Sequence, residues 1–267
     1  MIVFRRVMSD LREIRWGHVL VELVLVIAGI LIALWVNDWM EARKDARAER
    51  QYLELLARDL DNDVEVLAEV RDFQEKQAAD AALAYVALAE PVPPSQREAL
   101  ATKLEHLSTR RTLRFNPTTY TDLTGTGNVR LIRNRALRDQ VAQYYENTER
   151  ASAIIQRNNQ FFVDESYARY LSDNGLIAPR TGDNSAIVAT SAEQFESRTG
   201  LEVTTADDRL WTLPPDAPEW TILRNKVWQR GAVAQMASQQ LAGLTEEVKV
   251  ARKAVGDELA ARHWPGN

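Results

Sequence analysis

The chain has 267 residues, of which 45% are hydrophobic and 27% are charged, so it is long enough for one large domain or two small ones. It carries 33 Lys plus Arg against 38 Asp plus Glu, and this acidic balance argues against nucleic acid as a partner, because general nucleic-acid binding needs a basic face. The absence of cysteine excludes disulfides, a zinc ribbon and a thiol nucleophile.

Residues 19–36 form one apolar run, VLVELVLVIAGILIALWV, with a single charge at Glu22. A helix of this length spans about 27 Å, close to the roughly 30 Å hydrocarbon core of a bilayer. Its 13 Leu, Ile and Val residues contribute roughly −4 to −8 kcal/mol to insertion, against a cost of about 3 kcal/mol for a central acidic residue. The alternatives are a buried core helix and a cleaved signal peptide, whose apolar stretch is usually shorter. We therefore expect an uncleaved signal anchor that forms a single transmembrane helix.

Tryptophans mark both ends of this run, because Trp16 precedes it and Trp35 and Trp39 close it. Such aromatic belts lie at the two headgroup levels of a membrane. Four arginines precede the run and four basic residues soon follow it, so the positive-inside count is a tie. We predict a cytoplasmic tail at 1–18, because its arginines lie closer to the span and their outward movement would oppose the membrane potential.

One stripe of the predicted span combines Glu22, Gly29 and Ala33, because steps of seven and four residues share a helix face. Gly29 and Ala33 form a small-xxx-small pair, which lets another helix approach closely. An ionisable side chain on the same stripe is expected to face a partner and not lipid. The alternative is that Glu22 reaches the headgroups and the small pair is incidental. Besides the lipid bilayer, the candidate partners are a second copy of the chain or another membrane protein.

Beyond the span, the sequence predicts an all-α protein in which the transmembrane helix continues into an antiparallel bundle of long helices. Good helix formers continue until a proline cluster at 91–94, and leucines recur every seven residues from Leu53 to Leu67. The predicted divisions are a charged helical stalk at 37–51, the first part of the bundle at 52–172, an irregular connector at 173–215, a long C-terminal helix of the same bundle at 216–262 and a tail at 263–267.

Capping signals predict where the other helices begin. Ser95 and Glu98 form a capping box for a second helix. Asn116, followed by a proline, is predicted to cap a short third helix. Asn134 is predicted to cap a long fourth helix that ends near Tyr170.

Three stretches together resemble a known family. They are ELVLVIAGILIAL at 22–34 with Asn37-Asp38-Trp39 after it, Tyr52-Leu53 with Leu60, and a segment that runs from Thr119-Tyr120 through Gly127-Asn128-Val129 to Asn134 and Leu137. They resemble domain-of-unknown-function family 6090, an uncharacterised family of bacterial single-span proteins. The resemblance covers about the first 145 residues, with mild departures at Trp35 and at 124–126. It implies a helical fold and a bacterial single-span membrane protein, and it implies no activity. Together with the predicted cytoplasmic tail, this makes the expected location the bacterial inner membrane, with the C-terminal domain in the periplasm.

The segment from 109 to 138 is unusually basic for an acidic chain. The residues of interest there are Arg110, Arg111, Arg114, Tyr120, Asn128, Arg130 and Arg133. One interpretation is a site for an anionic ligand or a partner, built from arginine forks and helix N-termini. The other, which we favour, is that these arginines pair with carboxylates on the long helices and order the connector.

No residue set in the sequence indicates catalysis. The three histidines, His18, His106 and His263, lack metal-ligand spacing, and adjacent carboxylates on a helix point in different directions. We therefore predict no enzyme activity, no metal and no cofactor. The function we expect is that of a membrane-anchored interaction or scaffold protein. The alternative is a sensory or anion-binding module that acts through a partner membrane protein.

Overall fold

The computed structural model describes residues 16–176, 193–200, 209–262 and 264, and in these residues the chain is helical, with no strand. The predicted all-α class is therefore confirmed. The elements are α2 (Trp16–Ala87), α3 (Pro94–His106), α4 (Thr118–Gly125), η1 (Asn128–Leu131), α5 (Arg135–Asn158), η2 (Asn159–Ala168), α6 (Arg169–Asp173), a helical stretch at 193–199, η3 (Arg209–Thr212) and α8 (Pro218–Ala261).

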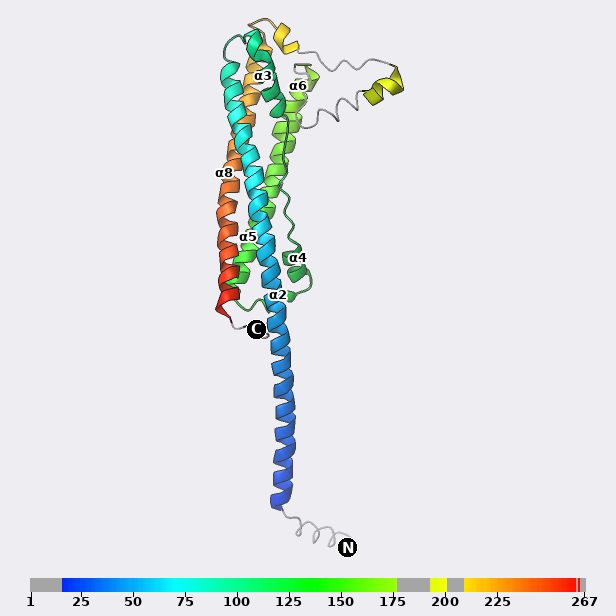
Figure 1. Cartoon of the computed structure of the whole chain (residues 1–267), viewed down its shortest axis with the longest axis vertical. Coiled ribbons are helices and arrows are strands. Elements are labelled where there is room, and N and C mark those ends of the chain that lie inside the picture. The colour runs from blue at the N-terminus through cyan, green and yellow to red at the C-terminus, as the bar shows by residue number, and fades with distance from the viewer. Residues whose placement is uncertain (1–15, 177–192, 201–208, 263, 265–267) are drawn as a thin grey trace, which may run out of the picture.

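Helix α2 is a single rod of 72 residues, which corresponds to about 108 Å. It starts at Trp16, just before the apolar run, and continues without a break into the bundle, as the sequence predicts. Ala, Leu, Glu and Arg dominate its sequence, and it contains no proline. Figure 1 shows its first part standing free of the other helices and its second part packed among them.

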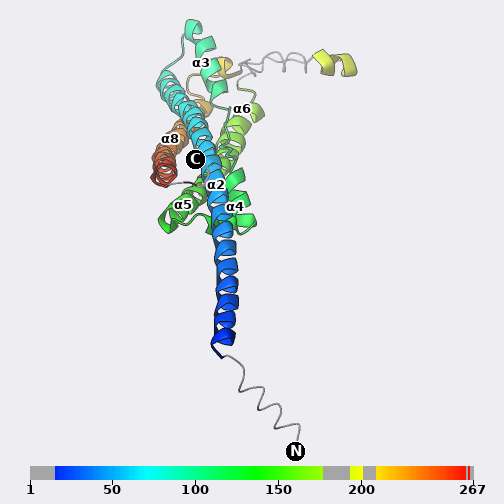
Figure 2. The ribbon, with the colours of Figure 1, turned by 60° about the horizontal axis from the view of Figure 1, so that its bottom comes forward.

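Three long helical stretches make up the bundle, and two of them run in the same direction. Helix α8 is antiparallel to α2, whereas the continuous stretch α5–η2–α6 is parallel to α2 (Figures 1 and 2). We call the end of the bundle next to the free part of α2 its base, and the opposite end, where α3 begins, its far end (Figure 1). The parallel arrangement arises because α3 and the chain after it return from the far end to the base before α5 begins. The bundle is thus not a simple alternation of up and down helices.

The returning segment is extended. The side-chain amide Nε2 of Gln77 donates to Thr109 Oγ1 at 3.3 Å, and the backbone N–H of Thr119 donates to Asp59 at 3.1 Å. On α2 these two contact points lie 18 residues, or about 27 Å, apart. Ten residues of the returning chain cover that distance at about 2.7 Å each, which is well above the 1.5 Å per residue of a helix and approaches the roughly 3.3 Å of a fully extended backbone.

The core is formed by two apolar clusters, one along the lower part of the bundle and one at its far end. The lower cluster includes Leu53, Leu60 and Leu67, which are fully buried, so the seven-residue repeat does mark the packed face of α2. The upper cluster includes Ala81 of α2, beside which Gly231 of α8 lies so close that a Cβ on the glycine would be 2.7 Å from the Ala81 Cβ.

Two predicted helix starts are displaced. The capping box at Ser95 is wrong, because α3 already begins at Pro94 and has no side-chain cap; proline suits this first position because it has no N–H to satisfy. Helix α4 begins at Thr118, whose hydroxyl donates to Asn116 at 2.5 Å, so Asn116 lies outside the cap position. The cap at Asn134 is confirmed, since its side chain accepts from the N–H of Leu137 at 3.2 Å.

Other predicted boundaries are close to the observed ones. The fourth helix extends through η2, ten residues of π-helix, to the end of α6, and α8 covers most of the predicted 216–262. Part of the predicted connector is helical, at 193–199 and in η3, and the rest of it lies outside the described residues, as do the first 15 residues and most of the tail. The stalk is shorter than predicted, because Glu49 is only 1% exposed and belongs to the bundle.

Candidate functional sites

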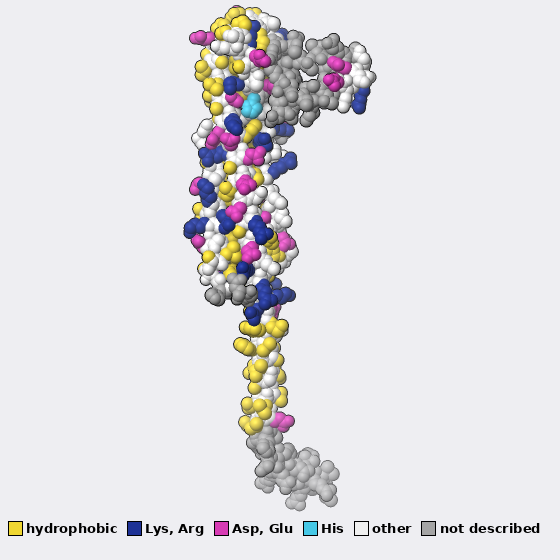
Figure 3. Space-filling view, viewed as in Figure 1, with side chains coloured by type: hydrophobic (Ala, Val, Ile, Leu, Met, Phe, Trp, Pro, Cys, Tyr) yellow, Lys and Arg dark blue, Asp and Glu magenta, His cyan; other side chains and the backbone are white. Residues whose placement is uncertain are grey.

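The first candidate site is the free part of α2. This is the one helix in the described chain that is long and apolar enough to cross a membrane, and its apolar stretch is not buried against the rest of the protein. Large apolar side chains are exposed all around it; Leu25 is 67% exposed and Ile32 62%. Figure 3 shows this apolar column below the charged surface of the bundle.

The helical geometry places Glu22, Gly29 and Ala33 on one exposed stripe of this column. Nothing lies within 4 Å of a Cβ built on Gly29, so the stripe is open to a close neighbour. At the bundle end of the column Trp39 is 48% exposed, and the Arg43 guanidinium lies 4.7 Å from its ring centroid. Trp35 is exposed as well, and the side chain of Trp16 lies outside the described part of the structure.

The arginines of the 109–138 segment divide into two groups. Arg110 pairs with Asp164, and Arg111 pairs with Glu69 at 2.7 Å. Arg133, in contrast, lies at the base of the bundle beside Glu49. Because Glu49 and Glu69 are 20 residues apart on α2, the two groups are separated by about 30 Å. The structure therefore does not assemble these arginines into one site.

The remaining residues of this segment lie at the base or on the surface. Arg114 and Arg130 are exposed. The ring of Tyr120 stacks on that of Tyr145, with centroids 4.5 Å apart. Asn128 donates to the hydroxyl of Tyr52 at 3.1 Å. These contacts, with the ion pairs above, favour the interpretation that the segment is ordered by the long helices.

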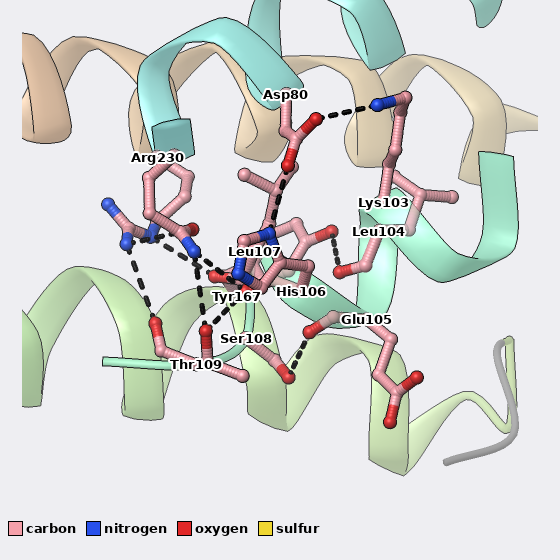
Figure 4. A network of polar contacts seen from close by, with 11 residues as sticks. Asp80, Lys103, Leu104, Glu105, His106, Leu107, Ser108, Thr109, Tyr167 and Arg230 are labelled. Atoms are coloured by element: carbon pink, nitrogen blue, oxygen red, sulfur yellow. Dashed lines mark hydrogen bonds and ion pairs between the residues drawn. The ribbon is translucent and has the colours of Figure 1, made fainter. Parts of the chain in front are cut away.

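A buried polar layer near the junction of the two core clusters was not predicted. Its centre is Arg230 of α8, which is only 1% exposed (Figure 4). The guanidinium donates to the carbonyl of Leu107 at 3.1 Å and to Gln77 Oε1 at 3.0 Å. No carboxylate of the described residues pairs with it, and burial lowers the pKa of Arg230 to about 10. The sequence did contain a signal, because Arg230 stands between Val227 and Ala234 on the apolar stripe of α8.

Arg230 is the first member of a series of side chains that bond the extended segment. Four carbonyls of that segment, each two residues after the last, accept from the bundle: those of Leu107 and Thr109 from Arg230, that of Arg111 from Asn159 and that of Leu113 from Ser152. This spacing is the two-residue repeat of an extended chain, whose alternate carbonyls point to the same side. Side chains of α5, η2 and α8 thus take the place that a neighbouring strand would have.

Beside this layer, Asp80 of α2 receives two contacts from α3. Lys103 Nζ lies 2.6 Å and His106 Nδ1 2.9 Å from its carboxylate oxygens (Figure 4). Burial acts to raise the pKa of Asp80, but the hydrogen bonds from Lys103 and His106 outweigh it and lower the pKa. His106 is therefore a hydrogen-bond partner of an aspartate. In the described chain no group of three or more His, Asp or Glu side chains is arranged to hold a metal.

A second unpredicted network ties the base of the bundle together. Buried Glu49 of α2 accepts from the backbone N–H of Arg133 at 2.7 Å and from the Arg262 guanidinium at 2.9 Å. Arg262 also pairs with Glu258 at 2.6 Å, and Asn134 donates to Glu258 at 2.7 Å. The end of the free helix is thus joined to the start of α5 and the end of α8 at one point.

These observations define a class: an all-α protein in which one long N-terminal helix, apolar enough to cross a membrane, continues into a helical bundle. A family model described as "Family of unknown function (DUF6090)" matches residues 22–161, more than half of the chain, and the chain belongs to that family. The match begins at Glu22 and ends in η2, so it includes the apolar column and the extended segment but not α8. No curated protein and no solved structure matches the chain.

Proposed function

We propose that this protein is a single-pass protein of the bacterial inner membrane, in which residues 19–36 cross the bilayer and the bundle serves as an interaction scaffold in the periplasm. The observation that carries the membrane part is the exposure of the apolar column. Between Leu20 and Met40 it leaves 15 large hydrophobic side chains exposed. At about 1.5–3 kcal/mol for each fully buried side chain, and with about half of each exposed, water contact would cost on the order of 10–20 kcal/mol. That equals or exceeds the whole stability of a typical domain, roughly 5–15 kcal/mol.

The proposed orientation has the N-terminus in the cytoplasm, and it can be tested because the chain has no native cysteine. Single cysteines are introduced as Ser95→Cys, at an exposed position next to the start of α3, and as Asp10→Cys in the N-terminal tail. Intact cells are then treated with a membrane-impermeant maleimide. We expect labelling of Ser95→Cys and not of Asp10→Cys, and the reverse pattern would place the bundle in the cytoplasm.

Support for a scaffold role comes from apolar side chains exposed at the far end of the bundle. Leu83 and Val86 of α2 are 58% and 72% exposed, and Trp228 of α8 is 60% exposed. Along the α2–α8 pair, all three lie within about two helical turns of the point where Gly231 meets Ala81. Large apolar side chains exposed on the surface of the bundle can serve as contacts for a partner protein. A second contact would be made in the membrane, through the stripe of Glu22, Gly29 and Ala33.

The membrane contact is tested by the association of the full chain in vesicles, measured by energy transfer between labelled copies. Gly29→Ile fills the open stripe and is expected to lower association, because the β-branched side chain keeps a neighbouring helix away. Leu31→Ile makes an apolar change at a 60% exposed position on the opposite face of the helix, and it serves as the matched control. Equal association of both variants and the original chain would refute a role for this stripe in self-association.

A further inference from the structure

A cavity of about 270 Å³ lies between the end of α2 and the starts of α3 and α8. These segments are at the end of the bundle remote from the apolar column (Figure 1). Four segments meet there: the turn after α2, the start of α3, η3 with the residues after it, and the first turns of α8. Its volume is just below the roughly 300–1,000 Å³ of typical small-molecule sites. A ligand for this space would be small, with roughly a dozen non-hydrogen atoms.

Two tryptophans form flat apolar walls of this distal cavity. The ring centroids of Trp211 and Trp220 lie 6.3 Å apart, with an angle of 44° between the rings. The Trp220 ring is held by its Nε1, which donates to the carbonyl of Pro214 at 3.0 Å. The Trp211 Nε1 is buried and has no hydrogen-bond partner among the described residues. Leu88 and Leu213 complete an apolar surface that suits a planar ring.

Two arginines bring positive charge to the same space. Arg97 comes from α3 and Arg224 from α8, and neither forms an ion pair with a carboxylate of the described chain. In this they differ from Arg110, Arg111 and Arg133, which all have acidic partners. Arg97 lies over the Trp211 ring at 5.6 Å and donates from its Nε to the carbonyl of Val92 at 3.4 Å. Arg224 lies over the Tyr85 ring at 5.6 Å.

The balance of charge at the distal cavity is therefore positive. Glu90 is the one carboxylate among the residues that line it, against two guanidinium groups. Trp220 and Arg224 stand in the first turns of α8, whose N-terminus has no side-chain cap. Glu219 in the first turn offsets the positive potential of the helix dipole, but it is not among the residues that line the cavity. The Arg224 Nε atom is buried without a hydrogen-bond partner in the described structure. Arginine forks of this kind suit the two oxygens of a carboxylate.

We propose that the distal cavity binds a small aromatic carboxylate, whose ring lies against Trp211 and Trp220 and whose anionic group is held by Arg97 and Arg224. This site is separate from the basic 109–138 segment, and it makes ligand binding a property of the end of the bundle farthest from the apolar column. The proposal does not rest on membrane insertion, on orientation or on a protein partner, so it can fail or succeed independently of them.

The test uses the full-length protein in non-ionic detergent micelles and isothermal titration calorimetry. The probe is indole-3-acetate, and its neutral counterpart indole-3-acetamide has the same ring and nearly the same shape. We expect saturable one-site binding of the acid, at least tenfold tighter than binding of the amide, because only the acid can pair with the guanidinium groups. Absence of saturable binding, or equal affinity for the two compounds, would overturn the proposal.

Variants assign the binding to the cavity. Arg97→Gln and Arg224→Gln should each weaken the acid at least tenfold and leave the amide almost unaffected. Arg135→Gln is the matched control, because its side chain is 85% exposed at the base of the bundle, and it should bind like the original chain. Thermal unfolding in the absence of ligand identifies a variant that does not fold. If Arg224→Gln does not fold, the affinity of Arg97→Gln, a variant of the shorter helix α3, tests the site in its place. Unchanged affinity in a folded Arg97→Gln or Arg224→Gln variant would refute the site.

Discussion

Asp63 offers a sharp test of the core, because it is a carboxyl group in an apolar seam. It stands on α2 between Leu60 and Leu67, and it is only 1% exposed. The Tyr144 hydroxyl donates to it at 3.0 Å. Burial raises the pKa of Asp63 from 3.8 to about 6; the hydrogen bond from Tyr144 opposes this shift, and the negative charge of Asp59 adds to it.

The direction of the pH effect follows from these two pKa values. Between about pH 4 and pH 6 the folded protein retains a proton on Asp63 that the unfolded chain has released. The free energy of unfolding therefore falls as the pH rises through this window. Below about pH 4, Asp63 does not change the free energy of unfolding. A shift of about two units at 1.36 kcal/mol per unit means that ionised Asp63 costs roughly 3 kcal/mol of stability at neutral pH.

The perturbation is Asp63→Asn, which keeps the shape and an acceptor for Tyr144 but cannot ionise. Urea unfolding of the full chain in non-ionic micelles, followed by circular dichroism from pH 4 to pH 8, measures the effect. We expect the variant to match the original chain near pH 4 and to be more stable by about 2–3 kcal/mol at pH 7. Asp72→Asn is the control, because that side chain is 64% exposed. Equal pH slopes in Asp63→Asn and the original chain between pH 4 and pH 6 would show that the reasoning is wrong.

Two further substitution pairs can be measured by the same urea titration. Gly231→Ala should destabilise the bundle by about 1–3 kcal/mol, because the new methyl group would lie 2.7 Å from Ala81 Cβ, whereas Gly243→Ala meets no atom within 4 Å and should stabilise α8 by about 0.5–1 kcal/mol. Similar values for the two would mean that α2 and α8 are not in close contact at this point. Glu49→Gln should cost about 3 kcal/mol, because it leaves two arginine contacts at the base without a buried anion, and Glu54→Gln, a surface ion pair, should cost less than about 1 kcal/mol. A small effect at Glu49 would argue that this network is open to water.

The local features of the chain were predictable because they depend on neighbours in sequence. The leucine repeat at Leu53, Leu60 and Leu67 marks a helix face whatever packs on it, and all three are buried. Asn134 caps α5 because an asparagine side chain reaches the N–H three residues on. The displaced start at Ser95 has a local reason as well, since the proline before it occupies the first helical position.

The site residues were less predictable, because their partners are distant in sequence. Arg230 was missed although it stands on an apolar stripe, since its acceptors, Gln77 and the carbonyls at 107 and 109, are all more than 120 positions away. The distal cavity was missed for the same reason, because its tryptophans and arginines come from segments that span residues 88–224. The basic 109–138 segment shows why closeness in sequence is a weak guide to a site, because the extended chain separates its arginines by about 30 Å. The favoured interpretation, pairing with carboxylates of the long helices, agrees with the ion pairs of Arg110, Arg111 and Arg133.

The sequence by itself determined the apolar run, the helical class and most helix boundaries, since hydrophobic periodicity and helix propensity act over a few residues. It also carried the family resemblance, which the match over residues 22–161 confirms. Only the tertiary structure decided that α5 runs parallel to α2, that Glu49 and Arg230 are buried, and that two tryptophans and two arginines enclose one cavity. The physical reason is that these features depend on how an extended segment returns along the bundle, and the hydrogen bonds that hold it come from helices far away in the chain.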